Sequence, residues 1–158
     1  MRHGAFEKAL KDIEETISNN YLRPEVFEAR GRIYMEQRDH EAAMHDFTAA
    51  ISRGGKSASI FHARSEAYFF LGELDLALED IQNAQRLAPE DPCLYDLEGL
   101  ILNQKRMYEK ADLSFEKALE LNSDNAIHYF NRGVAYMWRG RYDKAVEDFS
   151  REIGRAHV

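Results

Sequence analysis

Apolar residues recur at spacings of three and four positions along almost the whole chain of 158 residues, and short polar segments interrupt them. This spacing places apolar side chains on one face of an α-helix, so the pattern predicts a series of amphipathic helices. A small residue also recurs every 34 positions, at Ala9, Ala43, Ala77, Ala111 and Ala145. Four positions after each alanine stands a large apolar residue: Ile13, Phe47, Ile81, Phe115 and Phe149. An internal period of this length indicates an array of two-helix units.

Two further sets of positions keep the same period in the first helix of each unit. One set is aromatic and comprises Phe27, Phe61, Tyr95 and Tyr129. The other set is small and comprises Gly31, Ser65, Gly99 and Gly133. We expect the small residues where paired helices approach most closely, because a larger side chain there would force the helices apart.

The segments between the units carry signals for helix starts. Asp91 precedes Pro92, which is a favourable N-cap residue followed by a proline whose missing N–H costs nothing at that position. Pro24 is predicted to open another helix in the same way, and Ser57 or Ser59 is expected to cap the helix that follows the segment SRGGKS.

A pair of helices in every period, with these aromatic, glycine and alanine positions, resembles the tetratricopeptide repeat. The match is clearest in the last unit, at Tyr129, Gly133, Tyr136, Ala145 and Phe149. The chain departs from the usual pattern where Ser65 replaces the glycine, where Leu102 replaces the tyrosine, and in having only Pro89 at the closing proline position. The resemblance implies an all-α fold, a right-handed α-solenoid of antiparallel helix hairpins with a 34-residue period.

The same register divides the chain into units. We predict the second helix of a truncated repeat with its linker over 1–23, then repeats over 24–57, 58–91, 92–125 and 126–158, the last of them incomplete. Because the chain starts and stops inside a unit, we expect it to be a fragment of a longer protein. One codon reading of residues 153–158 resembles a sequencing adapter, so we hypothesise that this segment is not native; the nucleotide record would test the hypothesis.

A charge pairing follows from comparing the units with one another. Three arginines each precede an aspartate by sixteen positions: Arg30 and Asp46, Arg64 and Asp80, Arg132 and Asp148. In the remaining unit both positions differ, with Glu98 and Ser114 in their place. We predict a salt bridge between the two helices of three units and none in the fourth. The alternative is that these are independent, solvated surface charges.

Composition and charge restrict the class of function. The 21 basic and 28 acidic residues give a net charge of −7, which argues against nucleic-acid binding. Cys93 is the single cysteine and excludes an internal disulfide framework, which fits a reducing compartment. The sequence has no apolar run long enough to span a membrane and no signal peptide at its start, so we predict a cytoplasmic protein without a membrane partner.

Three segments suggest chemistry but have a structural interpretation. GGKS at residues 54–57 ends like a phosphate-binding loop, but Ala50 stands where that motif needs glycine and no strand is predicted before it. His40 and His45 are five positions apart, whereas a zinc-binding helix needs histidines four apart, and His40 stands at a position that is apolar in the other units. Cys93 is interpreted as an ordinary small residue. We therefore predict no cofactor, no metal site and no enzymatic activity.

The resemblance implies that the first helix of each unit lines a concave groove that binds a partner. The expected peptide-binding residues are Arg32, Met35, His62, Glu66, Phe69, Phe70, Leu97, Leu100, Phe130, Asn131, Val134, Met137 and Trp138. The lining is acidic and polar in the first unit, and apolar and aromatic in the later ones. An apolar groove favours a helix or an extended apolar peptide as the ligand. The alternative is that part of this surface is buried, by tight packing or by flanking repeats.

Family members that hold the carboxylate tail of chaperones use lysine, asparagine and arginine at set groove positions. Read from Pro24, this chain offers Glu28, Arg32, Ala63, Cys93 and Leu97 at those positions, so chaperone-tail binding is disfavoured. Asn131 stands at a position where the family hydrogen-bonds the backbone of a ligand. The sequence therefore predicts a non-catalytic scaffold for protein–protein interaction; the alternative is a targeting or regulatory arm of a larger enzyme such as a transferase or phosphatase.

Overall fold

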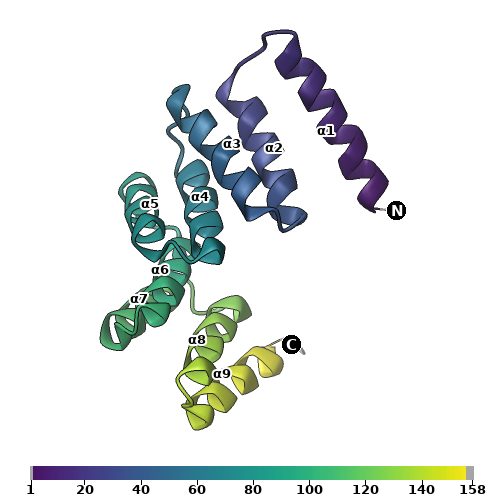
Figure 1. The fold of residues 1–158 in the computed structure, drawn as a ribbon. Coiled ribbons are helices and arrows are strands. Elements are labelled where there is room, and N and C mark those ends of the chain that lie inside the picture. Colours follow the sequence, from purple (N-terminus) through teal and green to yellow (C-terminus); the bar gives the residue numbers. More distant parts are fainter. Residues whose placement is uncertain (1, 156–158) are drawn as a thin grey trace. The chain divides into compact units, whose positions relative to one another are not determined.

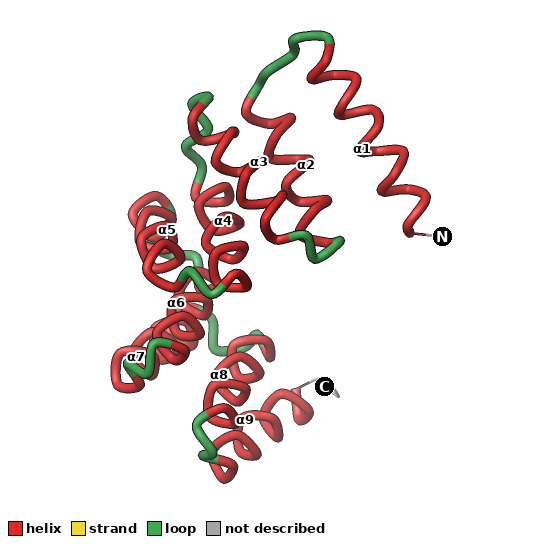
Figure 2. Tube along the Cα trace, viewed as in Figure 1, coloured by secondary structure: helices red, strands yellow, loops and turns green. Residues whose placement is uncertain are grey.

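The computed structural model describes residues 2–155, and every regular element in that range is an α-helix (Figures 1 and 2). The helices are α1 (Arg2–Ser18), α2 (Pro24–Glu36), α3 (His40–Ser52), α4 (Ala58–Leu71), α5 (Leu74–Leu87), α6 (Pro92–Gln104), α7 (Tyr108–Leu121), α8 (Ala126–Trp138) and α9 (Tyr142–Arg155). The all-α fold predicted from the sequence is confirmed. The segment 153–158 lies partly in α9 and partly outside the described residues.

The helices keep the period of the sequence. The helices α2, α4, α6 and α8 begin at Pro24, Ala58, Pro92 and Ala126, and each start lies one full period after the one before. The predicted starts are confirmed at Pro24 and Pro92, and the side chain of Asp91 accepts a hydrogen bond from the Cys93 amide. The residue limits of the individual repeats stay a prediction.

The small residues lie where paired helices touch. A Cβ atom added to Gly31 would stand 2.8 Å from the ring of Phe47, and one added to Gly99 would stand 2.7 Å from the ring of Phe115. Both rings are fully buried. Any side chain at these glycines would therefore displace an aromatic ring that closes the hairpin.

The predicted salt bridges are present in three hairpins. Arg64 donates two hydrogen bonds to the Asp80 carboxylate, from Nε at 2.6 Å and from Nη2 at 2.8 Å. The pairs Arg30–Asp46 and Arg132–Asp148 have the same bidentate geometry. In the fourth hairpin the Ser114 hydroxyl instead donates to the Glu98 carboxylate at 2.9 Å, so the expected absence of a bridge between these two positions is confirmed.

The chain divides into two compact units, Met1–Ala84 and Gln85–Val158, and each is described by itself below. In the first, α1 packs on α2, α2 on α3, and α3 on α4 around a core of buried side chains. In the second, α6 pairs with α7 and α8 with α9, and α8 also packs on α6. No helix among the described residues is both long enough and apolar enough to cross a bilayer.

Candidate functional site

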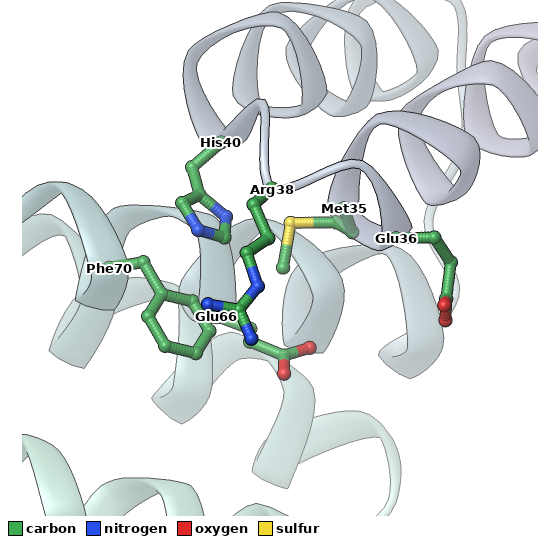
Figure 3. Close-up of a pocket in the computed structure, with 6 residues that line it drawn as sticks. All are labelled: Met35, Glu36, Arg38, His40, Glu66 and Phe70. Atoms are coloured by element: carbon green, nitrogen blue, oxygen red, sulfur yellow. The ribbon is translucent and has the colours of Figure 1, made fainter. Parts of the chain in front are cut away.

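The first unit carries a pocket of about 500 Å³ between α2, α3 and α4. It is lined by Met35, Glu36, Arg38, His40, Glu66 and Phe70. Figure 3 shows Phe70 and His40 on one side of the pocket and Glu36 on the other, with Arg38 and Glu66 between them. Met35 and Glu66 were predicted as groove residues, and the structure brings them together here with Phe70.

Local structure positions Arg38, His40 and Phe70 around the pocket. Arg38 ends the turn after α2 in the left-handed backbone region, with φ of 61°, and this conformation aims the chain into α3. Asp39 caps α3 by accepting a hydrogen bond from the Ala42 amide. His40, the next residue, stacks on the ring of Phe70 with the ring centroids 4.5 Å apart. The stacking holds a Phe70 side chain that is still 55% exposed.

A second depression of about 290 Å³ adjoins this pocket and shares Met35, Glu36 and Glu66 with it. Arg32 lines this depression and donates to the Glu28 carboxylate at 2.8 Å and to the Ser59 hydroxyl at 2.7 Å. Arg32 is thus already engaged with a carboxylate of its own helix.

Three charged groups of the pocket have no such partner. Glu36, Glu66 and Arg38 form no ion pair or hydrogen bond through their side chains with another described residue. Glu36 and Arg38 are exposed and Glu66 is half-buried. The pocket therefore offers two carboxylates and one guanidinium that form no ion pair among the described residues.

Not every predicted groove residue of this unit is available to a partner. Phe69 is 8% exposed, whereas its neighbour Phe70 is 55% exposed. His62 is half-buried. Arg38 and His40 are not among the predicted binding residues, because both lie beyond the end of the first helix of the repeat.

In the second unit, the helix α8 carries a face of exposed apolar side chains. Phe130 is 42% exposed, Met137 43% and Trp138 51%. The half-buried Val134 lies four positions after Phe130, and Met137 and Trp138 lie three and four positions after Val134, so the four side chains share one side of the helix. On α6, Leu100 is half-buried and Leu97 is 7% exposed, so Leu97 offers a partner little surface.

Asn131 takes part in a buried polar group between α6 and α8. Its side-chain amide donates to Asp96 Oδ2 at 3.1 Å, and the same oxygen lies 2.6 Å from Nδ1 of His128. His128 is fully buried. Burial raises the pKa of the Asp96 carboxyl, against the opposing effect of the His128 and Asn131 hydrogen bonds. The Asn131 amide is thus committed to its own unit, at a position where the family resemblance implied a ligand contact.

The contact between Asp96 and His128 was not predicted, although the sequence contains a signal for it. The positions equivalent to His128 in the preceding repeats hold Leu94, Ile60 and Val26, which are all apolar. A histidine at such a buried position needs a polar partner nearby.

Arg139 forms a second polar contact in this unit. Its side chain donates to Asn103 of α6 and, at 2.8 Å, to Asp112 of α7. The guanidinium also lies 4.9 Å from the ring centroid of Tyr108 and 5.3 Å from that of Tyr136. Arg139 was not predicted, because the residues to which it donates are 27 to 36 positions away in the sequence.

The segments considered for catalysis or metal binding have ordinary surroundings. GGKS lies in the turn between α3 and α4, where Ser57 caps α4 by accepting a hydrogen bond from the Ile60 amide. Partial burial raises the pKa of the Cys93 thiol, with added effects of Asp91 and Asp96, which lowers its nucleophilic thiolate fraction. Among the described residues, no three His, Cys, Asp or Glu side chains are grouped so that they could hold a metal ion.

Comparisons with known proteins agree with this geometry. The family model described as "Tetratricopeptide repeat" matches residues 1–58, 28–92 and 97–157. The mitochondrial import receptor subunit TOM70 of Homo sapiens is 23% identical over 196 residues, which cover 95% of this chain and 32% of TOM70. Tetratricopeptide repeat protein 13 of Homo sapiens is 31% identical over 130 residues, which cover 82% of this chain and 15% of that protein. The chain thus spans less than a third of the length of these two relatives.

Solved structures share the fold. MamA, from residue 41 to its end, from Desulfovibrio magneticus RS-1 superimposes with a TM-score of 0.83 at 20% identity, covering 99% of this chain and 88% of that chain. YrrB, described as a TPR protein with an unusual peptide-binding site, superimposes with a TM-score of 0.76 at 21% identity, covering 98% of this chain and 79% of that chain.

Proposed function

Because the chain belongs to the tetratricopeptide repeat family, we propose that it is a non-catalytic scaffold that binds a peptide or helix of a partner protein on its first helices. Proteins of this family generally act as protein-interaction scaffolds and are generally not enzymes. What is specific to this chain is the surface on which the partner binds.

The exposed apolar face of α8 carries the proposal. Phe130, Met137 and Trp138 each leave two-fifths or more of their surface in solvent, although they are large apolar side chains on one helix face. Apolar side chains gathered in this way are typical of a contact surface, and aromatic residues supply much of the affinity in such contacts. Phe70 adds a similar exposed ring in the first unit, beside the 500 Å³ pocket.

Removal of two aromatic rings tests the proposal. Peptides are selected from a displayed random library on the full chain, and their affinity is measured by fluorescence anisotropy. The double variant Phe70→Ala/Trp138→Ala should bind them at least about tenfold more weakly, while its circular dichroism stays that of the wild type.

A matched control uses exposed apolar residues of second helices. Leu113 of α7 is 64% exposed and Tyr142 of α9 is 65% exposed. The variant Leu113→Ala/Tyr142→Ala should bind as the wild type does. Equal binding by both double variants, or a library that yields no binding peptide, would refute the proposal.

Chaperone-tail binding remains disfavoured in this proposal. Of the five groove positions considered for a carboxylate tail, only Arg32 carries a positive charge, and Glu28 already holds it at 2.8 Å. Because TOM70 is only 23% identical, its role as an import receptor subunit is not carried over to this chain. The same binding surface would also serve as a targeting or regulatory arm of a larger enzyme. The cytoplasmic location stays a prediction from the sequence.

A further inference from the structure

The charges of the 500 Å³ pocket in the first unit are not balanced. Glu36 and Glu66 contribute two carboxylates without an ion-pair partner among the described residues, and Arg38 contributes one guanidinium. The adjoining depression shares both glutamates, and its own cation, Arg32, is paired with Glu28. The surface that a partner meets here therefore carries a local excess of negative charge beside an apolar wall.

Neither Glu36 nor Glu66 has an acidic residue at the equivalent positions of the other repeats considered below. The positions equivalent to Glu36 in the following repeats hold Phe70, Gln104 and Trp138. The positions equivalent to Glu66 hold Arg32 in the preceding repeat, and Leu100 and Val134 in the following ones. Packing of the repeat does not require an acid at either position, so the two carboxylates are a feature of this pocket.

Arg38 shows what kind of group the pocket accommodates. Its side chain extends from the α2–α3 turn into the pocket, between Phe70 and the side occupied by Glu36 (Figure 3). The guanidinium forms no ion pair there with another described residue. A cationic side chain of the chain itself thus lies in the pocket without being held by either carboxylate.

We infer that the pocket binds a lysine or arginine side chain of the partner segment, with the cation at Glu36 and Glu66 and the aliphatic stem against Met35 and Phe70. The inference rests on the proposed function and adds the chemical class of the partner, a basic amphipathic peptide. The long stems of lysine and arginine cover apolar surface while their charged ends stay at the rim. Phe70, fixed by its stacking on His40, offers its exposed ring to that stem.

The first test compares defined probes. Capped synthetic peptides of equal length, built from Lys-Leu, Gln-Leu or Glu-Leu repeats, are titrated into the full chain, and the methyl resonance of Met35 reports binding in the pocket. We expect the Lys-Leu peptide to shift this resonance and the Glu-Leu peptide not to. A Glu-Leu peptide that binds as well as the Lys-Leu peptide would overturn the inference.

The role of the two glutamates is tested with a double variant and a control variant that has the same net charge. Glu36→Gln/Glu66→Gln should weaken binding of the Lys-Leu peptide about fivefold, and added salt should reduce the difference. The control Glu15→Gln/Glu73→Gln removes the same charge from exposed positions of the same unit, outside the pocket. An equal loss of affinity in both variants would show general attraction to an acidic chain and would overturn the inference.

A variant of Arg38 tests the inference in the opposite direction, because it should bind the Lys-Leu peptide more tightly. Gly72 and Gly140 stand at the positions equivalent to Arg38 in two later repeats and also have positive φ, 81° and 72°, so Arg38→Gly suits the backbone. Removing the resident cation should tighten binding of the Lys-Leu peptide about threefold. Weaker binding of the Lys-Leu peptide by Arg38→Gly would show that Arg38 does not compete with the peptide cation, and the inference would be wrong.

The outcomes separate this inference from the proposed function. If library peptides bind and depend on Phe70 and Trp138 but the Lys-Leu peptide does not bind, the scaffold proposal holds and the basic-peptide inference fails. If no peptide binds by either route, both fail.

Discussion

At the scale of single residues, the hairpin α4–α5 differs from the others at the positions where its two helices approach most closely. The positions equivalent to Gly31 and Phe47, which touch in the first hairpin, hold Ser65 and the smaller side chain of Ile81 in this one. The Ser65 hydroxyl is fully buried and donates to the Ala77 carbonyl at 2.8 Å. We infer that these two departures from the repeat pattern are matched, since the smaller apolar residue would leave room for a hydrogen-bonded serine.

This pairing predicts a compensated double variant. Ile81→Phe alone should destabilise the chain by about 1–3 kcal/mol, because the ring would have to occupy space next to Ser65. Adding Ser65→Gly should recover most of that loss, which urea denaturation of the two single variants and the double variant would measure. Strictly additive losses would show that residues 65 and 81 do not share this space.

GGKS shows how far a residue motif can mislead when it is taken alone. A Cβ added to Gly55 would stand 2.9 Å from the Ala50 carbonyl oxygen and 2.8 Å from Ile60, so glycine is required there by packing between α3 and α4. The sequence predicts a turn between helices for this segment, because the segment lies at the boundary between two repeats. It could not reveal how tightly the turn is packed, since that depends on the side chains of both flanking helices.

At the scale of helices, the bridges between paired helices were predictable because the repeats act as internal comparisons. The unit with Glu98 in place of arginine has also lost the aspartate, and the structure replaces the bridge with a hydrogen bond from Ser114. In the other hairpins the aspartate is nearly buried: the side chain of Asp80 is 4% exposed and that of its partner Arg64 16% exposed. The hydrogen bonds to Asp80 raise the pKa of the Arg64 guanidinium, so this arginine stays charged over the whole ordinary pH range.

We expect Arg64→Ala to destabilise the chain by about 3 kcal/mol, because it leaves the Asp80 carboxylate buried without a counter-charge. The matched control is Arg32→Ala, which removes an arginine whose side chain is 53% exposed in its ion pair with Glu28 and should cost less than about 1 kcal/mol. Thermal or urea denaturation would measure both losses. A similar, small loss in the two variants would mean that the hairpin bridges contribute no more than surface ion pairs.

The contacts between successive hairpins were harder to predict than those within one. Asp96 and His128 are 32 positions apart, and their pairing depends on which residues of α6 and α8 face each other. The other repeats are apolar at the His128 position, so only the deviation from them carries the signal. The same holds for the predicted groove: the register gave Phe69 and Phe70 alike, whereas packing buries one and leaves the other exposed.

At the scale of the whole chain, the period of the repeat determines the fold class but not how far stability is shared along the array. In repeat proteins each repeat contacts only the repeats next to it in the sequence, so the free energy of unfolding is roughly the sum of a contribution from each repeat and one from each interface between neighbours. The chain contains two compact units, residues 1–84 and 85–158, and the hairpins α2–α3 and α8–α9 belong to different ones. Damage in one of these hairpins should therefore leave the other largely protected.

Gly133→Val tests this expectation, because a Cβ at Gly133 would stand 2.7 Å from the ring of Phe149 and should open α8–α9. Hydrogen exchange should then speed up at the amides of α8 and α9, while the amides of α2 and α3 keep their wild-type protection. Gly31→Val is the mirror experiment, since the same contact with Phe47 should loosen α2 and α3 alone. Loss of protection in all four helices in either variant would show that the chain unfolds as one cooperative unit. The contacts of the central helices would then couple the stability of the two hairpins.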